Sequence, residues 1–473
     1  MSQEPPAPYP ETTLEFAAEK ASAARRAFAA WSRLDASARV RALRGLWKEL
    51  ARRRAEAAAV IAEETGKPPT EVELMEFGAA GLLVDHFCRN ARRLLEERAV
   101  GIPWIFANKR AAVRRRPRGV IGVISPWNMP FLIPFGDAFC AMLAGNAVLL
   151  KPSERAARTA LWLESAAAAT GLLPEGLLSV VPGRREAGER VVDACDLVLF
   201  TGSRETGRAV AQRAAARLRP AILELGGKHP MIVLEDAPLE RASAAAVWGA
   251  FQNLGQVCVG VERAFVEGAA YEAFVERARR RMEALRPGEM GRFVLPAQLD
   301  RVLAQLEDAR AKGAQVIGGE PLDRIEGRMS PALVLGARPE MLVMREETFG
   351  PVLPVMRVAR AEEAVALCNA GELGLAASVW SRDLERAERL AAALDAGMTG
   401  VNEPGTHYAF GGLPFGGVKS SGMWRRHGEE GLLALTQAQS LIVHEWPADV
   451  PDPWWYPYEA RKTSLLSRLI GLP

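Results

Sequence analysis

From Gly119 onward, short apolar runs alternate with longer stretches of helical spacing, and this alternation limits the possible folds more than any other feature. Helical stretches such as 155–170 and 205–217 separate the runs. Strands separated by helices predict a parallel, doubly wound sheet, in which ligands bind at the carboxyl ends of the strands. The apolar runs are residues 119–125, 147–151, 178–181, 197–201 and 221–224.

The same alternation resumes after Cys258, so we predict a second doubly wound α/β domain joined to the first near Gly226 and Gly227. Its expected strands are residues 263–267, 315–318 and 376–380. Residues 13–93 carry apolar side chains at helical spacing and predict a helical opening. Residues 99–118 surround the turn-forming Asn108 with β-branched and aromatic residues, which predicts a protruding ribbon.

Charge and cysteine usage exclude several functional classes. The 60 basic and 57 acidic residues leave a net charge of +3, too small to predict a nucleic-acid partner. The five cysteines lie far apart, without a CxxC pair or metal-ligand spacing, so we predict no metal site and a reducing, cytoplasmic setting. The acidic, Pro-rich start is not typical of a signal peptide, and no membrane-spanning segment is expected.

Polar residues follow three of the predicted strands. Asn128 lies between two prolines that restrict its backbone, so its amide could donate to an oxyanion, although a Pro-rich turn explains the string equally well. Lys151 and Glu154 could hold two ribose hydroxyls, although Ser153 could simply cap a helix. Gly202 and Ser203 would let a phosphate approach a helix N-terminus, or would serve as an ordinary cap, and the GxGxxG pattern is absent.

Cys258 follows Glu224 by 34 positions (258 − 224). A cysteine is usually a small buried hydrophobe. A thiol served by a carboxylate base can instead attack a carbonyl and hold it covalently. Taken alone, the pair favours the structural interpretation of Cys258.

The ordered set of motifs changes that balance. The strings PWN, KPSE, FTGSxxxG, ELGGK, GQVC, EExFGP and PFGGxKxSG occur in this order. In order and spacing they resemble the aldehyde dehydrogenase superfamily from about residue 13 to residue 442. The resemblance implies that Cys258 attacks an aldehyde carbon, while the Asn128 amide and the Cys258 backbone N–H hold the oxyanion. Glu224 would then activate the water that hydrolyses the thioester to the carboxylic acid.

The resemblance also implies a nicotinamide dinucleotide as cofactor. NAD is favoured because the Glu154 carboxylate would repel a 2′-phosphate, and NADP stays possible because Arg155 could offset that repulsion. The implied cofactor contacts are Trp127, Lys151, Glu154, Gly202, Ser203, Glu347 and Phe349.

Substrate choice would depend on the walls of an entry channel. Gly136 stands where the family often has a bulky aromatic residue, which predicts a wider channel. These segments hold no arginine to bind a carboxylate, so we expect an apolar medium-chain or aromatic aldehyde rather than a semialdehyde acid. A CoA-acylating enzyme or a non-catalytic relative is less favoured, because Glu224, Cys258 and Asn128 are all present. The implied channel residues are Met129, Ile133, Gly136, Val257, Val259 and the stretch 404–410.

The expected organisation has a Rossmann-like cofactor domain, a catalytic domain and a small β bridging element for oligomerisation. The resemblance implies a homodimer or a homotetramer. The aromatic, amphipathic tail has two interpretations, of which packing across a subunit interface is favoured over contact with a bilayer surface. The expected parts are 1–98 with 119–226 (cofactor domain), 227–412 (catalytic domain), 413–436 (return to the cofactor domain), 99–118 with 437–446 (bridging element) and 447–473 (tail).

Overall fold

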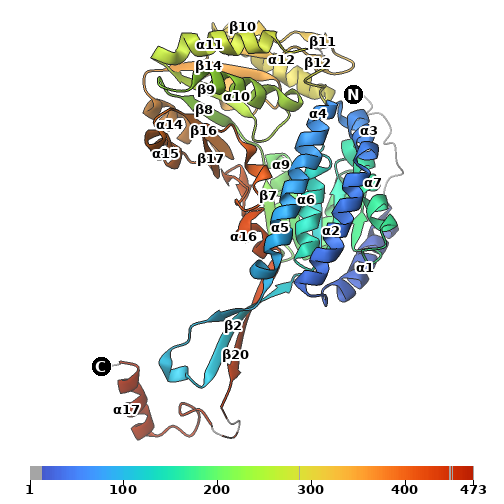
Figure 1. Cartoon of the computed structure of the whole chain (residues 1–473), viewed down its shortest axis with the longest axis vertical. Coiled ribbons are helices and arrows are strands. Elements are labelled where there is room, and N and C mark those ends of the chain that lie inside the picture. The colour runs from blue at the N-terminus through green and yellow to red at the C-terminus, as the bar shows by residue number, and fades with distance from the viewer. Residues whose placement is uncertain (1–12, 287, 447–448, 450, 472–473) are drawn as a thin grey trace.

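The computed structural model of the chain describes residues 13–286, 288–446, 449 and 451–471 (Figure 1). The predictions for the Pro-rich start at 1–12, and for positions 447–448, 450 and 472–473 of the tail, lie outside the described residues. Among the residues that are described, no helix is long and apolar enough to cross a membrane.

A six-stranded sheet of order β19-β7-β6-β3-β4-β5 forms one half of the body. Its pairs are parallel except for the antiparallel edge strand β19. The five strands predicted before residue 226 are confirmed to within one residue at each end. Its strands are β3 (Val120–Ser125), β4 (Ala147–Pro152), β5 (Leu178–Val180), β6 (Leu197–Thr201), β7 (Ala221–Glu224) and β19 (Gly422–Met423).

The strand order of this sheet reverses between β3 and β6. From β3 the chain moves outward through β4 and β5, and then returns to the other side of β3 with β6 and β7. Ligands of open α/β sheets bind at the carboxyl ends of strands beside such a switch point. The helices of this half are α6 (Leu132–Leu143), α7 (Ala157–Ala169), α8 (Arg185–Ala194), α9 (Arg204–Ala215) and α16 (Gly428–Ala434).

A seven-stranded sheet of order β10-β13-β14-β9-β8-β16-β17 forms the other half, and only its β10–β13 pair is antiparallel. The three predicted strands are confirmed, with β9 beginning two residues earlier than expected. The strands are β8 (His229–Val233), β9 (Val261–Glu267), β10 (Gln315–Gly318), β13 (Ala332–Leu335), β14 (Val352–Val358), β16 (Ala376–Trp380) and β17 (Met398–Val401). The helices are α10 (Leu239–Phe251), α11 (Gly268–Glu283), α12 (Pro296–Ala311), α13 (Leu342–Arg345), α14 (Ala361–Asn369) and α15 (Leu384–Ala392).

The helical opening is confirmed, with one irregularity that the periodicity did not predict. Asp35 caps α2 by accepting from the Ala38 backbone N–H at 2.7 Å, and α3 ends at Gly66 with a φ of +70°. A π-helix, η1 (Val72–Gly78), then precedes α5, and α5 packs against α2 and α6. The helices are α1 (Leu14–Trp31), α2 (Ala36–Arg52), α3 (Arg54–Thr65), α4 (Pro69–Glu71) and α5 (Ala79–Leu95).

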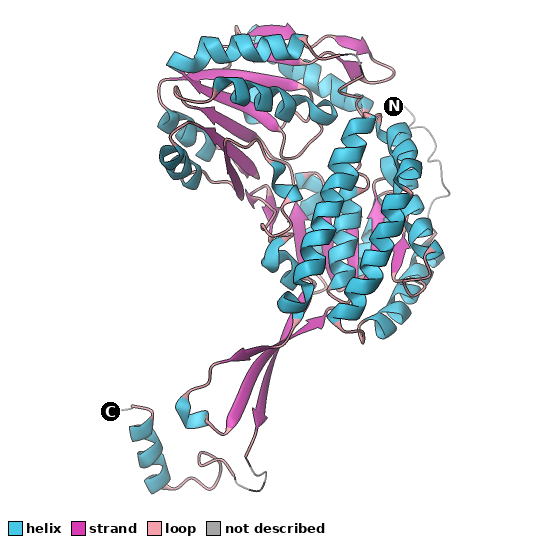
Figure 2. Ribbon diagram, in the orientation of Figure 1, coloured by secondary structure: helices cyan, strands magenta, loops and turns pink. Residues whose placement is uncertain are grey.

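The predicted ribbon extends away from the body as a three-stranded antiparallel sheet (Figure 2). It consists of β1 (Arg98–Val100), β2 (Lys109–Pro117) and β20 (Thr436–His444). The tail helix α17 (Ala460–Leu469) lies near the far end of the ribbon (Figure 1). An ion pair of 2.7 Å between Lys109 and Asp452 ties the tail to the ribbon, and the Trp454 ring packs edge-on against Phe106.

Candidate active site

A cavity of about 240 Å³ is lined by Asn128, Glu224 and Cys258 together. Asn128 follows β3, Glu224 ends β7, and Cys258 lies in the loop before β9. The cavity therefore receives polar groups from both halves of the body. Much of the remaining wall is apolar, with side chains such as Leu132, Leu225, Trp248, Tyr408 and Phe415.

The Cys258 loop has an unusual backbone that turns the thiol toward the cavity. The short helix η4 (Gln252–Gly255) contains Asn253 and Leu254 in the left-handed region, with φ values of +49° and +54°. Gly255 also has a positive φ, and a side chain there would collide with the Gly350 carbonyl, so only glycine fits. Strain of this kind is concentrated at functional sites.

The Cys258 thiol is neutral in this structure at physiological pH. Burial, with a smaller contribution from the charge of Glu224, raises its pKa to about 12. A thiolate is the nucleophilic form of cysteine, so the thiol must lose its proton as the reaction begins. The thiol proton must therefore pass to an acceptor before the sulfur can attack.

Glu224 has the environment of a general base. It is buried, and neither carboxylate oxygen has a hydrogen-bond partner among the described residues. Burial raises its pKa to about 8, while the charges of Arg426 and Arg425 act in the opposite direction. A carboxylate with a pKa in this range can take up and release a proton near neutral pH, which suits a general base.

Asn128 is buried and tied to the nucleophile loop. Its Nδ2 donates to the Gln256 backbone carbonyl at 2.9 Å, two residues before Cys258. An amide nitrogen has two N–H donors, so one remains for a ligand. Together with the Cys258 backbone N–H, it could donate to a developing oxyanion.

Arg426 lines the cavity and was not among the predicted residues. Its Nη1 forms a buried ion pair of 2.8 Å with Asp137 of α6, and burial raises the pKa of Asp137 to about 6. Its Nε and Nη2 have no hydrogen-bond partner in the part of the chain that the structure describes. The channel segments contain no arginine, as predicted, but an arginine from another segment reaches the same cavity.

Four of the predicted channel residues line the cavity, namely Met129, Ile133, Val257 and Val259. Gly136 is a correction, because it lies buried within α6 instead of widening the channel. A methyl group at this position would meet the Tyr408 hydroxyl at 2.9 Å and Leu83 at 3.2 Å. The glycine thus makes room for Tyr408, which lies in the predicted stretch 404–410 and lines the cavity. The residues that sequence reasoning missed include Leu74, Met75, Ala79, Trp248 and Arg426.

Two of the residues implied as cofactor contacts meet across the boundary between the sheets. The Trp127 and Phe349 rings lie edge to face, with centroids 5.7 Å apart. Lys151 is buried at the end of β4, with its Nζ 3.5 Å from the Glu154 carboxylate. An ammonium beside a carboxylate can bind two neighbouring sugar hydroxyls, one as donor and one as acceptor.

The remaining implied contacts are Gly202, Ser203 and Glu347, and the two side chains among them accept from backbone N–H groups. Ser203 caps α9 by accepting from the Thr206 N–H at 3.3 Å, which is the alternative that the sequence left open. A side chain at Gly202 would meet the Phe200 ring at 2.7 Å, so the approach to this helix N-terminus stays open. Glu347 accepts from the Gly227 N–H at 2.8 Å, and burial raises its pKa to about 7.

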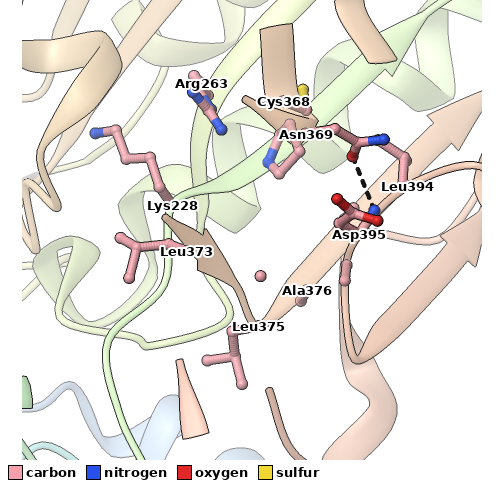
Figure 3. Close-up of a pocket in the computed structure, with 13 residues that line it drawn as sticks. Lys228, Arg263, Cys368, Asn369, Leu373, Leu375, Ala376, Leu394 and Asp395 are labelled. Atoms are coloured by element: carbon pink, nitrogen blue, oxygen red, sulfur yellow. Dashed lines mark hydrogen bonds between the residues drawn. The ribbon is translucent and has the colours of Figure 1, made fainter. Parts of the chain in front are cut away.

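A second cavity on the seven-stranded half is too small to be a substrate site. Its volume is about 10 Å³, which is no more than one water molecule requires. Figure 3 shows Lys228, Arg263, Cys368 and Asp395 around it, with a hydrogen bond of 2.8 Å from the Asp395 N–H to Asn369. The cavity at Cys258 has room for a substrate and is lined by the thiol, the acid and the amide, so it is the candidate site.

The α/β body brings a thiol, an acid and an amide together around one cavity. The chain belongs to the aldehyde dehydrogenase family, whose model matches residues 1–441. The family consists of oxidoreductases that act on aldehydes.

Among curated proteins, a 4,4'-diapolycopene aldehyde oxidase of Methylomonas sp is 43% identical over 444 residues, covering 92% of this chain and 83% of that protein. A putative succinate-semialdehyde dehydrogenase [NADP(+)] of Mycolicibacterium smegmatis is 37% identical, covering 81% of this chain and 76% of that protein. Among solved structures, an NAD-dependent aldehyde dehydrogenase from Sinorhizobium meliloti has a TM-score of 0.87 at 33% identity, covering 94% of this chain and 89% of that one.

A Mycobacterium tuberculosis aldehyde dehydrogenase complexed with NAD+ has a TM-score of 0.86 at 31% identity. This match covers 94% of our chain and 92% of that chain.

Proposed function

We propose that this protein oxidises an apolar aldehyde to its carboxylic acid, with NAD as the hydride acceptor. The observation that carries the proposal is the joint placement of Cys258, Glu224 and Asn128 around one mainly apolar cavity. The domain roles expected from the sequence belong to the same proposal: the six-stranded half binds the cofactor and the seven-stranded half carries the nucleophile.

The chemistry would proceed in two stages on Cys258. The thiol loses its proton to solvent water, its sulfur bonds to the aldehyde carbon, and the carbonyl oxygen becomes an oxyanion held by the Asn128 amide and the Cys258 N–H. Bound NAD supplies the acceptor for the hydride that leaves this carbon. Glu224 then takes a proton from water, which attacks the thioester and releases the acid and the thiol.

The residues present fit a dinucleotide. Lys151 and Glu154 offer a donor and an acceptor for one ribose, while Gly202 leaves the α9 N-terminus accessible to a pyrophosphate. NAD is preferred to NADP because a Glu154 carboxylate that accepts the ribose hydroxyls would repel a 2′-phosphate. NADP stays the alternative, since one relative is named as an NADP(+) enzyme.

The wall of the cavity supports an apolar substrate, medium-chain or aromatic, and the name of the relative from Methylomonas adds 4,4'-diapolycopene aldehyde as a candidate. A semialdehyde acid is the second candidate, because Arg426 lines the cavity and the relative from Mycolicibacterium is named for one. Arg426 is already paired with Asp137, so a substrate carboxylate would have to compete with a buried partner. The apolar aldehyde is therefore the first choice.

The ribbon and the tail support a homodimer or a homotetramer. Both strands of the long β2–β20 pair keep many side chains exposed, and Trp455, Tyr456 and Leu465 of the tail are exposed as well. The exposed apolar side chains of the tail, beside a ribbon that exposes arginines, are typical of a subunit interface. Contact of the same surface with a bilayer is the less favoured alternative.

The test is NADH formation with a panel of apolar aldehydes and succinate semialdehyde, run with NAD and with NADP. The wild type should turn over apolar aldehydes with NAD, and Cys258→Ser should lose about a thousandfold or more in rate. Aldehyde-dependent reduction at the wild-type rate in Cys258→Ser would contradict covalent catalysis. A clear preference for succinate semialdehyde would replace the apolar substrate with the second candidate.

A further inference from the structure

A short segment between α3 and α5 reaches both loops that carry the proposed catalytic groups. Residues 67–76 comprise the two residues that follow the Gly66 cap of α3, the short helix α4 and most of the π-helix η1. Three of its charged side chains, Lys67, Glu71 and Glu76, contact the backbone of the Asn128 loop or the Cys258 loop. The segment itself belongs to neither sheet.

Lys67 and Glu76 form an ion pair whose two side chains have no solvent exposure. Lys67 Nζ also donates to the Asn128 backbone carbonyl at 3.0 Å. Glu76 Oε2 accepts from the backbone N–H groups of Phe131 at 3.2 Å and Leu132 at 2.7 Å. The pair thus holds the loop at Asn128 and at the residues that follow it, and Glu76 satisfies amides at the start of α6.

Glu71 holds the second loop. Its two carboxylate oxygens accept from the Asn253 N–H at 2.9 and 3.0 Å, at a residue with left-handed backbone. The Asn253 side chain then donates to the Asn128 carbonyl at 3.1 Å and to the Gln256 carbonyl at 3.2 Å. The Gln256 carbonyl is also the acceptor of the Asn128 amide. Hydrogen bonds therefore connect the Asn128 loop directly to the Cys258 loop.

The π-helix explains how one segment serves both the loops and the cavity. A π-helix places more residues in each turn than an α-helix and occurs often at functional sites. Within η1, Leu74 and Met75 line the cavity, while the neighbouring Glu76 is fully buried beneath the Asn128 loop. A change in this turn would alter the substrate wall and the ion pair together.

We propose that Lys67, Glu71 and Glu76 are positioning residues that set the distance and orientation between the Asn128 amide and the Cys258 loop. They act through Asn128 and Asn253 and touch no reacting atom. This role rests on the proposed function, because it matters for rate only if the Asn128 amide donates to the oxyanion. Catalytic hydrogen bonds tolerate little displacement, and an error of about 1 Å can cost about a hundredfold in rate.

The test combines Lys67→Met with Glu76→Gln, so that neither partner leaves a buried charge unpaired. The rate of the NADH burst at saturating NAD and aldehyde should fall about ten- to a hundredfold, with the larger loss in kcat rather than in KM. Lys67→Arg with Glu76 unchanged, which keeps the charge and a donor, should retain most of the wild-type burst rate. Thermal unfolding of each variant shows that it is folded at the assay temperature.

The same pair of changes is then made together with Asn128→Ala. A positioning role predicts that Asn128→Ala alone slows the burst about a hundredfold, and that the added pair slows it by less than about threefold further. An equal loss with and without Asn128→Ala would overturn the positioning role alone, since it would mark a general structural effect. An unchanged burst in Asn128→Ala would overturn both the positioning role and the oxyanion assignment.

Glu71→Gln provides a milder variant if the double change does not fold. It removes the charge but leaves an oxygen to accept from the Asn253 N–H. We expect a burst about three- to tenfold slower, with no further loss in the Asn128→Ala background. A Glu71→Gln protein with the wild-type burst would overturn the role of Glu71 in the network.

Discussion

The two sheets bring different chemistry to the cavity, but both halves fix a nearby loop with the same kind of ion pair. The six-stranded half contributes Asn128 and Glu224, and the seven-stranded half contributes Cys258. Each half buries one lysine–glutamate pair beneath a loop of the site. Buried pairs of this kind contribute little net stability, so their value lies in fixing geometry.

The pairs differ in what they hold. The Lys67–Glu76 pair ends on the Asn128 loop, next to the reacting groups. In the other half, Lys228 and Glu262 are 2.6 Å apart, and Glu262 accepts from the backbone N–H groups of Thr348 and Phe349, each at 2.9 Å. On the proposed function, the first pair would serve the chemical step, whereas the second would hold a proposed cofactor contact. Variants can separate these roles.

Of the variants that compare the two halves, Glu224→Gln should have the largest effect, because it removes the base of the six-stranded half and leaves the thiol of the other half intact. Acylation precedes hydrolysis, so a burst of NADH should persist while steady turnover falls about a hundredfold or more. Rapid mixing with detection of NADH absorbance measures both phases. Equal losses in burst and steady phases would instead place Glu224 in the acylation step.

The pH dependence of hydrolysis tests the assignment of Glu224 as the base. Only ionised Glu224 can accept a proton, and burial raises its pKa from the ordinary 4.5 to about 8. Steady turnover should therefore be low near pH 6 and rise about fiftyfold toward pH 8, instead of levelling off near pH 5. The residual activity of Glu224→Gln should lack this rise. A wild-type profile that is flat above pH 5 would contradict the raised pKa.

Breaking the second ion pair should affect the cofactor rather than the chemistry. Lys228→Met with Glu262→Gln loosens the loop of Thr348 and Phe349, so the KM for NAD should rise about tenfold. The burst rate at saturating NAD should change less than in the Lys67→Met, Glu76→Gln variant. If both double variants lowered the burst equally and left the KM for NAD unchanged, the division of labour between the sheets would be wrong.

Gly136→Ala should have the smallest effect, and it tests a contact between the halves. The added methyl group would press on the hydroxyl of Tyr408, which comes from the loop after β17. Overpacking typically costs about 1–3 kcal/mol of folding free energy. We expect a lower melting temperature than in the wild type. The KM for bulky aldehydes should rise about threefold more than the KM for small ones. Unchanged values for both would show that Tyr408 moves aside freely.

The strands and the motifs at their ends could be predicted from the sequence because both depend on local patterns. Apolar runs with turn residues specified β3 to β7 almost to the residue, and the ordered motifs indicated Asn128, Glu224 and Cys258. Other features depend on contacts between distant segments. Asp137 and Arg426 are 289 positions apart (426 − 137), so no local pattern could pair them.

The sequence did not predict the π-helix or the surroundings of Gly136, for a related reason. Residues 72–78 have ordinary helical composition, and their extra residue per turn is stabilised by buried partners such as Lys67 and the start of α6. Gly136 looked like an empty space in the channel because the residue that fills it, Tyr408, comes from the other half. Tertiary packing decided both positions.

The antiparallel edge strand β19 also bears on how the protein is made. Gly422 of β19 pairs directly with Glu224, the last residue of β7. The two residues are 198 positions apart (422 − 224), so the strand that flanks the acid is synthesised long after the thiol at Cys258. A growing chain must therefore close a loop of this length before β19 can join the sheet beside the acid, and long-range pairing of this kind is slow. The edge of the sheet beside the acid is therefore completed long after the acid and the thiol have been synthesised.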